Sequence, residues 1–154
     1  MKIKEAIQQK KPFRGSRHKA IVNLIFTHNW ITDNLRLYLK PYDITLKQYN
    51  VLRILKGAGN PISTSDIRER LLDKMSDTSR IVERLYKKGL VKKTTSAADK
   101  RLVDVVLSRR GILLLTELEE HTAKMDNLLS ILTETEAELL SDLLDKIRGC
   151  QVGR

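Results

Sequence analysis

The chain has 154 residues, about the length of one domain, and carries a formal net charge of +10. Hydrophobic residues make up 41% and aromatic residues only 5%, which predicts an aliphatic core. One cysteine, Cys150, excludes an internal disulfide, and no apolar stretch approaches the roughly 18 residues that a membrane span needs. We therefore expect a cytoplasmic protein with no membrane partner.

The charge is unevenly distributed along the chain. Residues 1–108 contain 23 Lys and Arg against 10 Asp and Glu, a formal charge of +13. Residues 109–154 contain 6 against 9, a formal charge of −3. A basic region of this kind favours a polyanionic partner, either a nucleic acid or a membrane surface, although solubility alone would also account for it.

The first half of the chain reads as helices. Residues 1–15 are basic and polar, and could form a short helix or a loose arm. Apolar residues recur at helical spacing from Ser16 to about Leu39, where Lys40-Pro41 ends the helix. The Thr-x-x-Gln sequence from Thr45 to Gln48 is a capping box that predicts the next helix, which ends in the glycine-rich segment before Pro61.

Two short helices and a β-hairpin follow. Ser63 is the expected N-cap of a third helix that ends near Leu72. Ser76 or Asp73 opens a fourth helix, for which Gly89 is placed as the C′ residue. Two β-like runs, LVKKTT and LVDVVLS, then flank a tip of small residues and predict a hairpin.

The C-terminal third reads as two further helices. Ser108 begins a long leucine-rich helix that extends to about Leu129. The capping box Thr133-Glu134-Thr135-Glu136 then starts a last amphipathic helix.

This order of elements is the layout of a winged helix-turn-helix. The predicted fold class is mainly α with a small β-hairpin, in which N- and C-terminal dimerisation helices flank the winged helix-turn-helix. We assign residues 1–44 to an N-terminal arm and dimerisation helix, 45–108 to the DNA-binding unit, and 109–154 to C-terminal dimerisation helices, all in one structural domain.

The exposed face of the fourth helix predicts contacts with DNA. The N-terminal residues of such a helix approach base edges, while Arg and Lys bind phosphates. An ordinary amphipathic helix with a solvated charged face is the alternative. The candidate residues of this recognition helix are Ser76, Asp77, Ser79, Arg80, Arg84 and Lys87.

The hairpin predicts a second contact with DNA. An arginine on a protruding turn can enter the minor groove, where negative potential is concentrated. Asp99 can hold the guanidinium of Arg101 in place by charge-assisted hydrogen bonds, or can simply favour the turn. The candidate wing residues are Lys92, Lys93, Lys100 and Arg101, with Asp99 as the positioning residue.

From about residue 20 to 148 the chain resembles the MarR (multiple antibiotic resistance regulator) family. The matching marks are the Ser79-Arg80 pair, ERLYKKGLV leading into the wing, Asp99-Lys100-Arg101 as an Asp-x-Arg sequence, and Gly111 shortly after the second strand. The resemblance implies a homodimeric cytoplasmic transcriptional regulator, often a repressor that small ligands or oxidation release.

The leucine stripes of the terminal helices favour a homodimer independently of the resemblance, because they need another surface to cover them. A two-fold dimer places its recognition helices about one DNA turn apart, so it would bind a pseudo-palindromic operator with half-sites roughly 10 base pairs apart. A non-specific architectural DNA binder and a winged-helix module for protein–protein contact remain the alternative functions.

Other candidate sites are few. Trp30, Tyr38 and Tyr49 could line a cleft for a small-molecule effector, or could be plain core. The three histidines lack metal-ligand spacing, and no phosphate-binding loop or nucleophile motif occurs in the sequence. We therefore expect no cofactor, no metal and no enzymatic activity, and the sequence leaves open whether Cys150 has a redox role.

Overall fold

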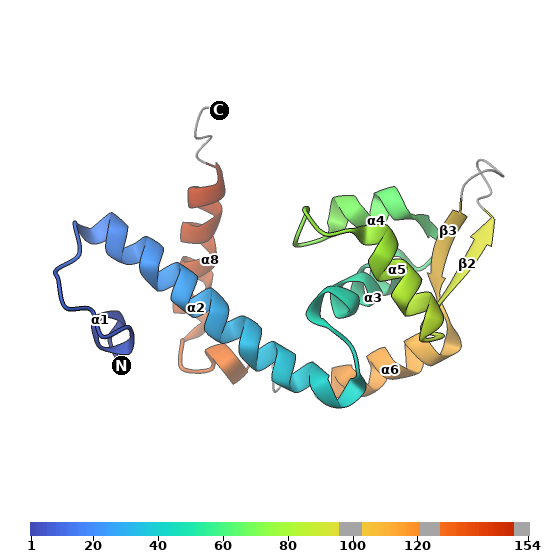
Figure 1. Cartoon of the computed structure of the whole chain (residues 1–154), viewed down its shortest axis with the longest axis horizontal. Helices are drawn as coiled ribbons and strands as arrows, with labels where there is room; N and C mark the ends of the chain where they lie inside the picture. Colours follow the sequence, from blue (N-terminus) through green and yellow to red (C-terminus); the bar gives the residue numbers. More distant parts are fainter. Residues whose placement is uncertain (96–102, 121–126, 150–154) are drawn as a thin grey trace. The chain divides into compact units, whose positions relative to one another are not determined.

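The computed structural model describes residues 1–95, 103–120 and 127–149. It is mainly helical with a small antiparallel sheet, as predicted (Figure 1). The chain divides into two compact units, Met1–Leu115 and Thr116–Arg154, and each is described by itself. Among the described helices, none combines the length and apolar composition that crossing a membrane would take.

The N-terminal region consists of a short helix and a long one. Helix α1 spans Ile3–Ala6, and α2 spans Ser16–Leu39, which confirms the predicted long helix. At Lys40-Pro41 the chain turns into a 3₁₀ helix, η1 (Lys40–Tyr42), and Asp43 ends it in the left-handed region with a φ of 52°. Only Leu39 is buried along α2, so this helix has little core of its own in the monomer.

Helix α3 (Leu46–Ala58) begins at the predicted capping box. The Thr45 hydroxyl accepts a hydrogen bond from the Gln48 amide at 3.2 Å, and the Gln48 side chain accepts one from the Thr45 amide at 3.0 Å. Helix α4 (Thr64–Arg70) starts at the expected cap, Ser63. The structure ends α4 two residues before Leu72, since Leu71 already has extended backbone angles.

Helix α5 (Thr78–Lys87) starts later than expected. Its cap is Asp77, whose carboxylate accepts from the Arg80 amide at 3.0 Å, so the prediction of Ser76 or Asp73 was wrong. At the other end Gly89, with a φ of 69°, donates to the Tyr86 carbonyl, and Leu90 donates to the Leu85 carbonyl. This pair of bonds is a Schellman motif and confirms Gly89 as the C′ residue.

The predicted hairpin is present and gains a third strand. Strands β2 (Val91–Thr95) and β3 (Val103–Leu107) pair with Val91 opposite Leu107. Strand β1 (Ile62–Ser63) pairs with the other edge of β3, which gives the order β1-β3-β2. A two-residue strand has no periodicity to detect, and its pairing partner lies about forty residues further along the chain.

The helix after β3 is shorter than predicted. Helix α6 spans Arg109–Glu120 in the described residues, and Asn127–Leu129 form a 3₁₀ helix, η2, so the extension of one α-helix to Leu129 was wrong. At η2 the Ser130 hydroxyl donates to the Asn127 carbonyl at 2.9 Å, a local bond that competes with a continuous helix. The last helix, α8 (Glu134–Gly149), starts at the predicted Thr133 capping box.

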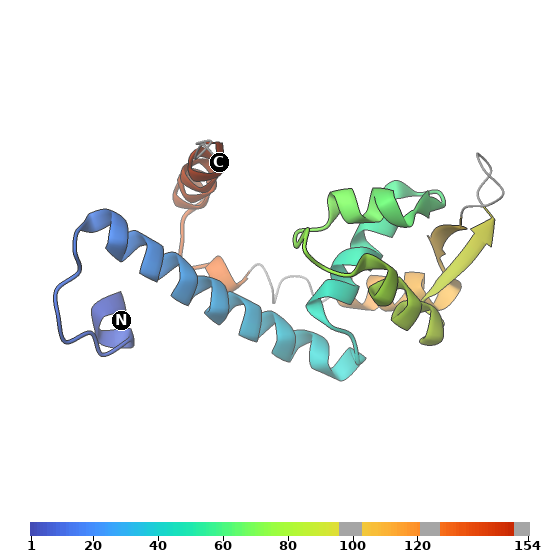
Figure 2. The ribbon, with the colours of Figure 1, turned by 45° about the horizontal axis from the view of Figure 1, so that its top comes forward.

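Helices α3, α4 and α5 pack against one another, and the sheet lies beside them (Figures 1 and 2). Gly111 is needed for this packing, because a Cβ there would lie 2.1 Å from the Leu90 carbonyl oxygen. The core is aliphatic, as the composition predicts. Its buried side chains are Val51, Leu52, Leu55, Ile67, Leu71, Val82, Leu85, Leu90, Val91 and Val105.

Candidate nucleic-acid interface

Helix α5 separates its apolar and polar residues cleanly. Thr78, Val82 and Leu85 are buried against α3 and α4. Four of the six predicted recognition residues, namely Ser79, Arg80, Arg84 and Lys87, are exposed on the opposite side of the helix. The side chains of Arg80, Arg84 and Lys87 form no ion pair with any residue that the structure describes. Three cations are thus available to an anionic partner.

The other two predicted recognition residues have structural roles. Ser76 precedes α5, is only 9% exposed, and donates its hydroxyl to Asp73 at 2.8 Å. Asp77 is exposed, but its carboxylate caps the helix at the Arg80 amide. Placing Ser76 on the exposed face of the helix was therefore wrong, because the helix starts after it and its hydroxyl is taken up in the preceding turn.

The wing residues within the described part of the chain differ from one another. Lys92 is exposed and makes no described ion pair. Lys93 pairs with Glu83 of α5, and its ammonium lies 4.9 Å from the centre of the Tyr86 ring. The hydrogen bond from Lys93 lowers the pKa of Glu83. Lys93 therefore ties strand β2 to α5, a contact that the sequence analysis missed.

The tip of the hairpin is not among the described residues. Asp99, Lys100 and Arg101 all lie outside them. The roles assigned to these three residues stay predictions from the sequence.

The turn between α4 and α5, residues 71–77, is held by a polar network centred on Asp73. Its carboxylate accepts from the Met75 amide at 3.0 Å and pairs with Lys47 of α3 at 2.8 Å. The side-chain bond from Lys47, with those from Ser76 and Met75, lowers the pKa of Asp73 to about 2. The turn is also fixed at Leu72, whose amide donates to the Asn50 side chain at 3.1 Å.

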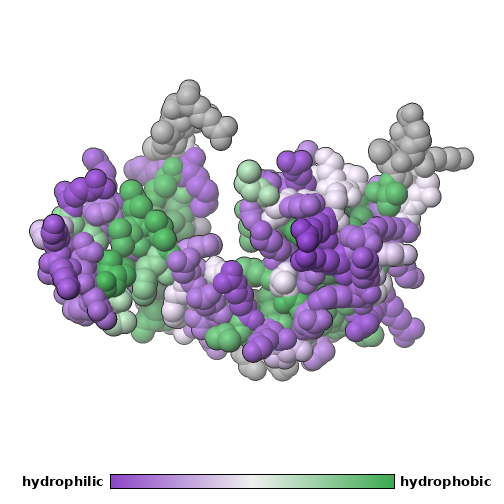
Figure 3. Space-filling model, viewed as in Figure 1, coloured by the Kyte–Doolittle hydropathy of each residue, from purple (hydrophilic) through white to green (hydrophobic). Residues whose placement is uncertain are grey.

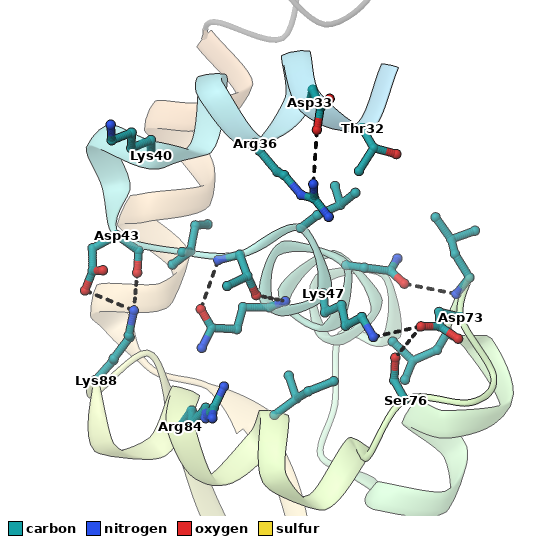
Figure 4. A pocket seen from close by; sticks show the side chains of 18 of the residues that line it. Thr32, Asp33, Arg36, Lys40, Asp43, Lys47, Asp73, Ser76, Arg84 and Lys88 are labelled. Carbon is teal, nitrogen blue, oxygen red and sulfur yellow. Dashed lines mark hydrogen bonds and ion pairs between the residues drawn. The ribbon is translucent and has the colours of Figure 1, made fainter. Parts of the chain in front are cut away.

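A cavity of about 1490 Å³ lies between α2, the start of α3, the turn before α5, and α5 itself (Figure 4). On α2 its lining includes His28, Thr32 and Arg36, which are spaced four residues apart and share one face, and Lys40, the first residue of η1, follows four residues later. On α5 it includes Ile81, Arg84 and Lys87. Three of the predicted recognition residues, Ser76, Arg84 and Lys87, therefore also line this cavity.

The three aromatic residues predicted for an effector cleft do not line this cavity. Trp30 is 45% exposed, and Tyr38 and Tyr49 are half-buried. Their assignment to an effector cleft, and the alternative that they are plain core, both stay predictions.

The charge of the cavity is positive. Six cationic side chains line it against three carboxylates, and each carboxylate is already paired. Arg36 pairs with Asp33 at 3.0 Å, Lys47 with Asp73 at 2.8 Å, and Lys88 with Asp43 at 3.0 Å. Lys40, Arg84 and Lys87 make no ion pair with the described residues, so the lining favours an anionic ligand.

Comparison with known proteins points to one family. A profile described as MarR family matches residues 42–102, which include α3, α4, α5 and β2. The transcriptional repressor IacR of Pseudomonas putida is 28% identical over 121 residues, which cover 78% of this chain and 72% of that protein.

Solved structures agree with these matches. The crystal structure of a mutant MarR from E. coli complexed with operator DNA has a TM-score of 0.73 at 28% identity, and covers 81% of this chain and 91% of that one. The organohalide-sensing regulator RdhR-CbdbA1625 in its 2,4-dichlorophenol-bound form has a TM-score of 0.78 at 23% identity, and covers 92% and 89%. This second likeness concerns the fold alone.

Proposed function

The chain belongs to the MarR family of winged helix-turn-helix regulators, and from this premise we propose that it binds operator DNA as a homodimer and regulates transcription. The observation that carries the proposal is the set of unpaired cations on α5. Arg80, Arg84 and Lys87 stand on the exposed side of the second helix of a helix-turn-helix, where a phosphate backbone would meet them. The similar E. coli protein was crystallised with operator DNA.

The dimer is supported by apolar surface that the monomer leaves uncovered. On α2 the side chains of Ile21, Ile25 and Trp30 are 57%, 58% and 45% exposed. On α8 no residue is buried, and Leu139, Leu143 and Ile147 are 57%, 50% and 58% exposed. Both helices show apolar surface in Figure 3. Apolar surface of this extent marks an interface, and a second copy of the chain would cover it.

The parts of the chain then take different roles. Residues 1–44 and 109–154 supply the dimerisation helices, and residues 45–108 bind one half of a pseudo-palindromic operator. In each half-site Ser79 and Arg80 approach base edges, Arg84, Lys87 and Lys92 bind phosphates, and Arg101, positioned by Asp99, enters the minor groove.

The positively charged cavity supports control by a small anionic effector, and we propose that the protein is a repressor that such a ligand releases. An anion bound between Lys40 of η1 and Arg84 of α5 would draw Arg84 and Lys87 away from the phosphates. Binding of ligand and of DNA would then oppose each other through shared side chains.

Selection of bound sequences from a random duplex pool tests the function. We expect an enriched palindrome, and an affinity that falls roughly 10³–10⁵-fold between 50 and 200 mM salt if 6–10 phosphates are contacted. Binding without an enriched sequence would indicate the architectural alternative. No binding at low salt would indicate a module for protein–protein contact.

The effector is tested with a variant that leaves the DNA-binding residues intact. Aromatic carboxylates such as benzoate and phenylacetate are titrated into the complex with selected DNA, and release is followed by fluorescence anisotropy. Lys40→Gln should require more carboxylate for release while binding DNA like the parent in its absence. Equal release from parent and variant would contradict the assignment of the anion site.

A further inference from the structure

Two large apolar side chains stand exposed on the turn before α5. Met75 is 94% exposed and Leu72 is 87% exposed. Single apolar residues on a surface are common, but this turn directly precedes the helix that carries the unpaired cations. The position therefore raises the question of what the Met75 side chain contacts.

The backbone that carries Met75 is fixed by several bonds. The Met75 amide donates to Asp73 at 3.0 Å, and the Ser76 amide donates to the Asp73 carbonyl at 3.2 Å. Lys47 holds Asp73 from α3, and Asn50 holds the start of the turn at Leu72. The network involves the backbone of Met75 and leaves its side chain in solvent, so the turn presents the thioether at a defined place.

The two apolar side chains have different surroundings. Leu72, Asp73 and Ser76 belong to the lining of the large cavity, whereas Met75 lies outside that lining. Met75 stands two residues before the cap Asp77, at the N-terminal end of α5, which is the end that approaches base edges in helix-turn-helix proteins. Exposed cations, Arg70 and Arg80, flank this turn on α4 and α5.

An apolar tip in a basic neighbourhood suits one particular feature of duplex DNA. The major groove is polar except for the C5-methyl group of thymine, which apolar side chains contact. Methionine is unbranched and polarizable, so it can fit against a methyl group whose place varies slightly. We propose that Met75 contacts a thymine methyl group in each operator half-site and so contributes to sequence specificity. This inference rests on the proposed function.

Single replacement of thymine by deoxyuridine tests the contact, because it removes only the methyl group. The duplex selected from the random pool is scanned one thymine at a time, and dissociation constants are measured for the parent and Met75→Ala. We expect one symmetry-related position at which deoxyuridine weakens binding by the parent about fourfold per half-site, the effect of one buried methyl-sized group. Met75→Ala should bind both duplexes equally.

Leu72→Ala is the matched control, because it shortens an apolar side chain of similar exposure on the same turn. It should keep the fourfold preference of the parent. Equal circular-dichroism melts of the three proteins would show that the turn is intact.

The outcomes separate this inference from the proposed function. If the parent binds a specific palindrome but no thymine position depends on Met75, the methyl contact is wrong while the regulator assignment stands. If the parent selects no sequence at all, both are wrong. A partner protein that binds at Met75, with unchanged DNA specificity in Met75→Ala, would also overturn the contact.

Discussion

The helix-turn-helix region and the two long helices differ in how much of their apolar surface the monomer covers. In residues 45–108, α3 buries Val51, Leu52 and Leu55, all 2% exposed or less. Along α2 only Leu39 is buried, and along α8 no residue is. Both regions are rich in leucine and isoleucine, so composition does not distinguish them.

This difference shows which region buries its apolar side chains within a single chain. Short helices and a sheet cover one another from several directions, so the DNA-binding region closes its own core. Each of the long helices α2 and α8 carries a stripe of apolar side chains that the rest of the chain does not cover. Stability in the first region should therefore be independent of protein concentration, whereas stability in the second should depend on it.

The largest expected loss of stability comes from a substitution in the buried core of residues 45–108. Leu52→Ala should lower the free energy of unfolding by about 2–5 kcal/mol, because it leaves a cavity at a fully buried position. Denaturant unfolding at several protein concentrations should give the same loss throughout. Leu139→Ala on α8 serves as the comparison: Leu139 is exposed in the single chain, so its effect should be largest at high protein concentration and shrink as dilution dissociates the dimer.

A charge on the exposed apolar face of α8 should weaken the proposed dimer. Leu143→Glu places a carboxylate on the apolar face of α8 and should weaken dimerisation by roughly 100-fold, since an unpaired charge in an interface costs several kcal/mol. Sedimentation equilibrium measures this directly. Leu72→Glu, on the turn before α5, should leave the dimer intact. A parent protein that stays monomeric at every concentration would contradict the proposed assembly.

Next in size is the loss of a cation from α5. Arg80→Ala should weaken operator binding by about 10- to 100-fold and relax the preference at the base it contacts. Lys146→Ala removes an exposed cation from α8 instead and should bind like the parent. If both variants lose affinity equally, the effect is one of overall charge and α5 is not the recognition helix.

The capping boxes of α3 and α8 predict two smaller losses of stability that can be compared directly. Thr45→Ala should cost about 1 kcal/mol, because the first turn of α3 loses an acceptor. Thr133→Ala removes the corresponding cap of α8, where the Glu136 amide bonds the Thr133 hydroxyl at 3.3 Å. Thermal melts at two concentrations should show a constant loss for the first and a concentration-dependent loss for the second, while Thr45→Ser should restore the cap.

The smallest expected effect is a dependence of the stability of the fold on pH below about 4, through Asp73. The pKa of Asp73 is lowered to about 2, so the native state binds this proton less readily than the unfolded chain does. Its stabilising contribution is complete above the ordinary pKa of an aspartate and is lost as pH falls from about 4 to 2. Asp73→Asn should be less stable than the parent from pH 5 to 8, and the two urea midpoints should converge near pH 2.

Much of the fold could be predicted because its signals are local. The caps at Thr45, Ser63 and Thr133 each involve residues three apart, and the Schellman motif at Gly89 is closed within five residues. Helical spacing of apolar residues and the hairpin followed from the same short-range rules. The order of these elements was then enough to indicate the winged helix-turn-helix, and the Ser79-Arg80 pair and the ERLYKKGLV segment indicated the family.

The candidate site was only partly predictable. Exposure of Arg80, Arg84 and Lys87 follows from the helical period, so sequence reasoning found them. The burial of Ser76 follows from its place in the turn before α5, where its hydroxyl donates to an Asp73 carboxylate that Lys47 of another helix also holds. Likewise, that Trp30, Tyr38 and Tyr49 lie outside the lining of the large cavity could not be read from the sequence, because the lining comes from several elements that only the fold brings together.

Local patterns in the sequence therefore sufficed for the main helices, the hairpin, their order and the basic face of α5, because these depend on interactions among residues a few positions apart. The ion pair of Lys93 with Glu83, and that of Lys88 with Asp43 across 45 residues of chain, became visible only in the folded protein. Such contacts form when packing brings distant side chains together, and no local pattern in the sequence encodes the distance between them.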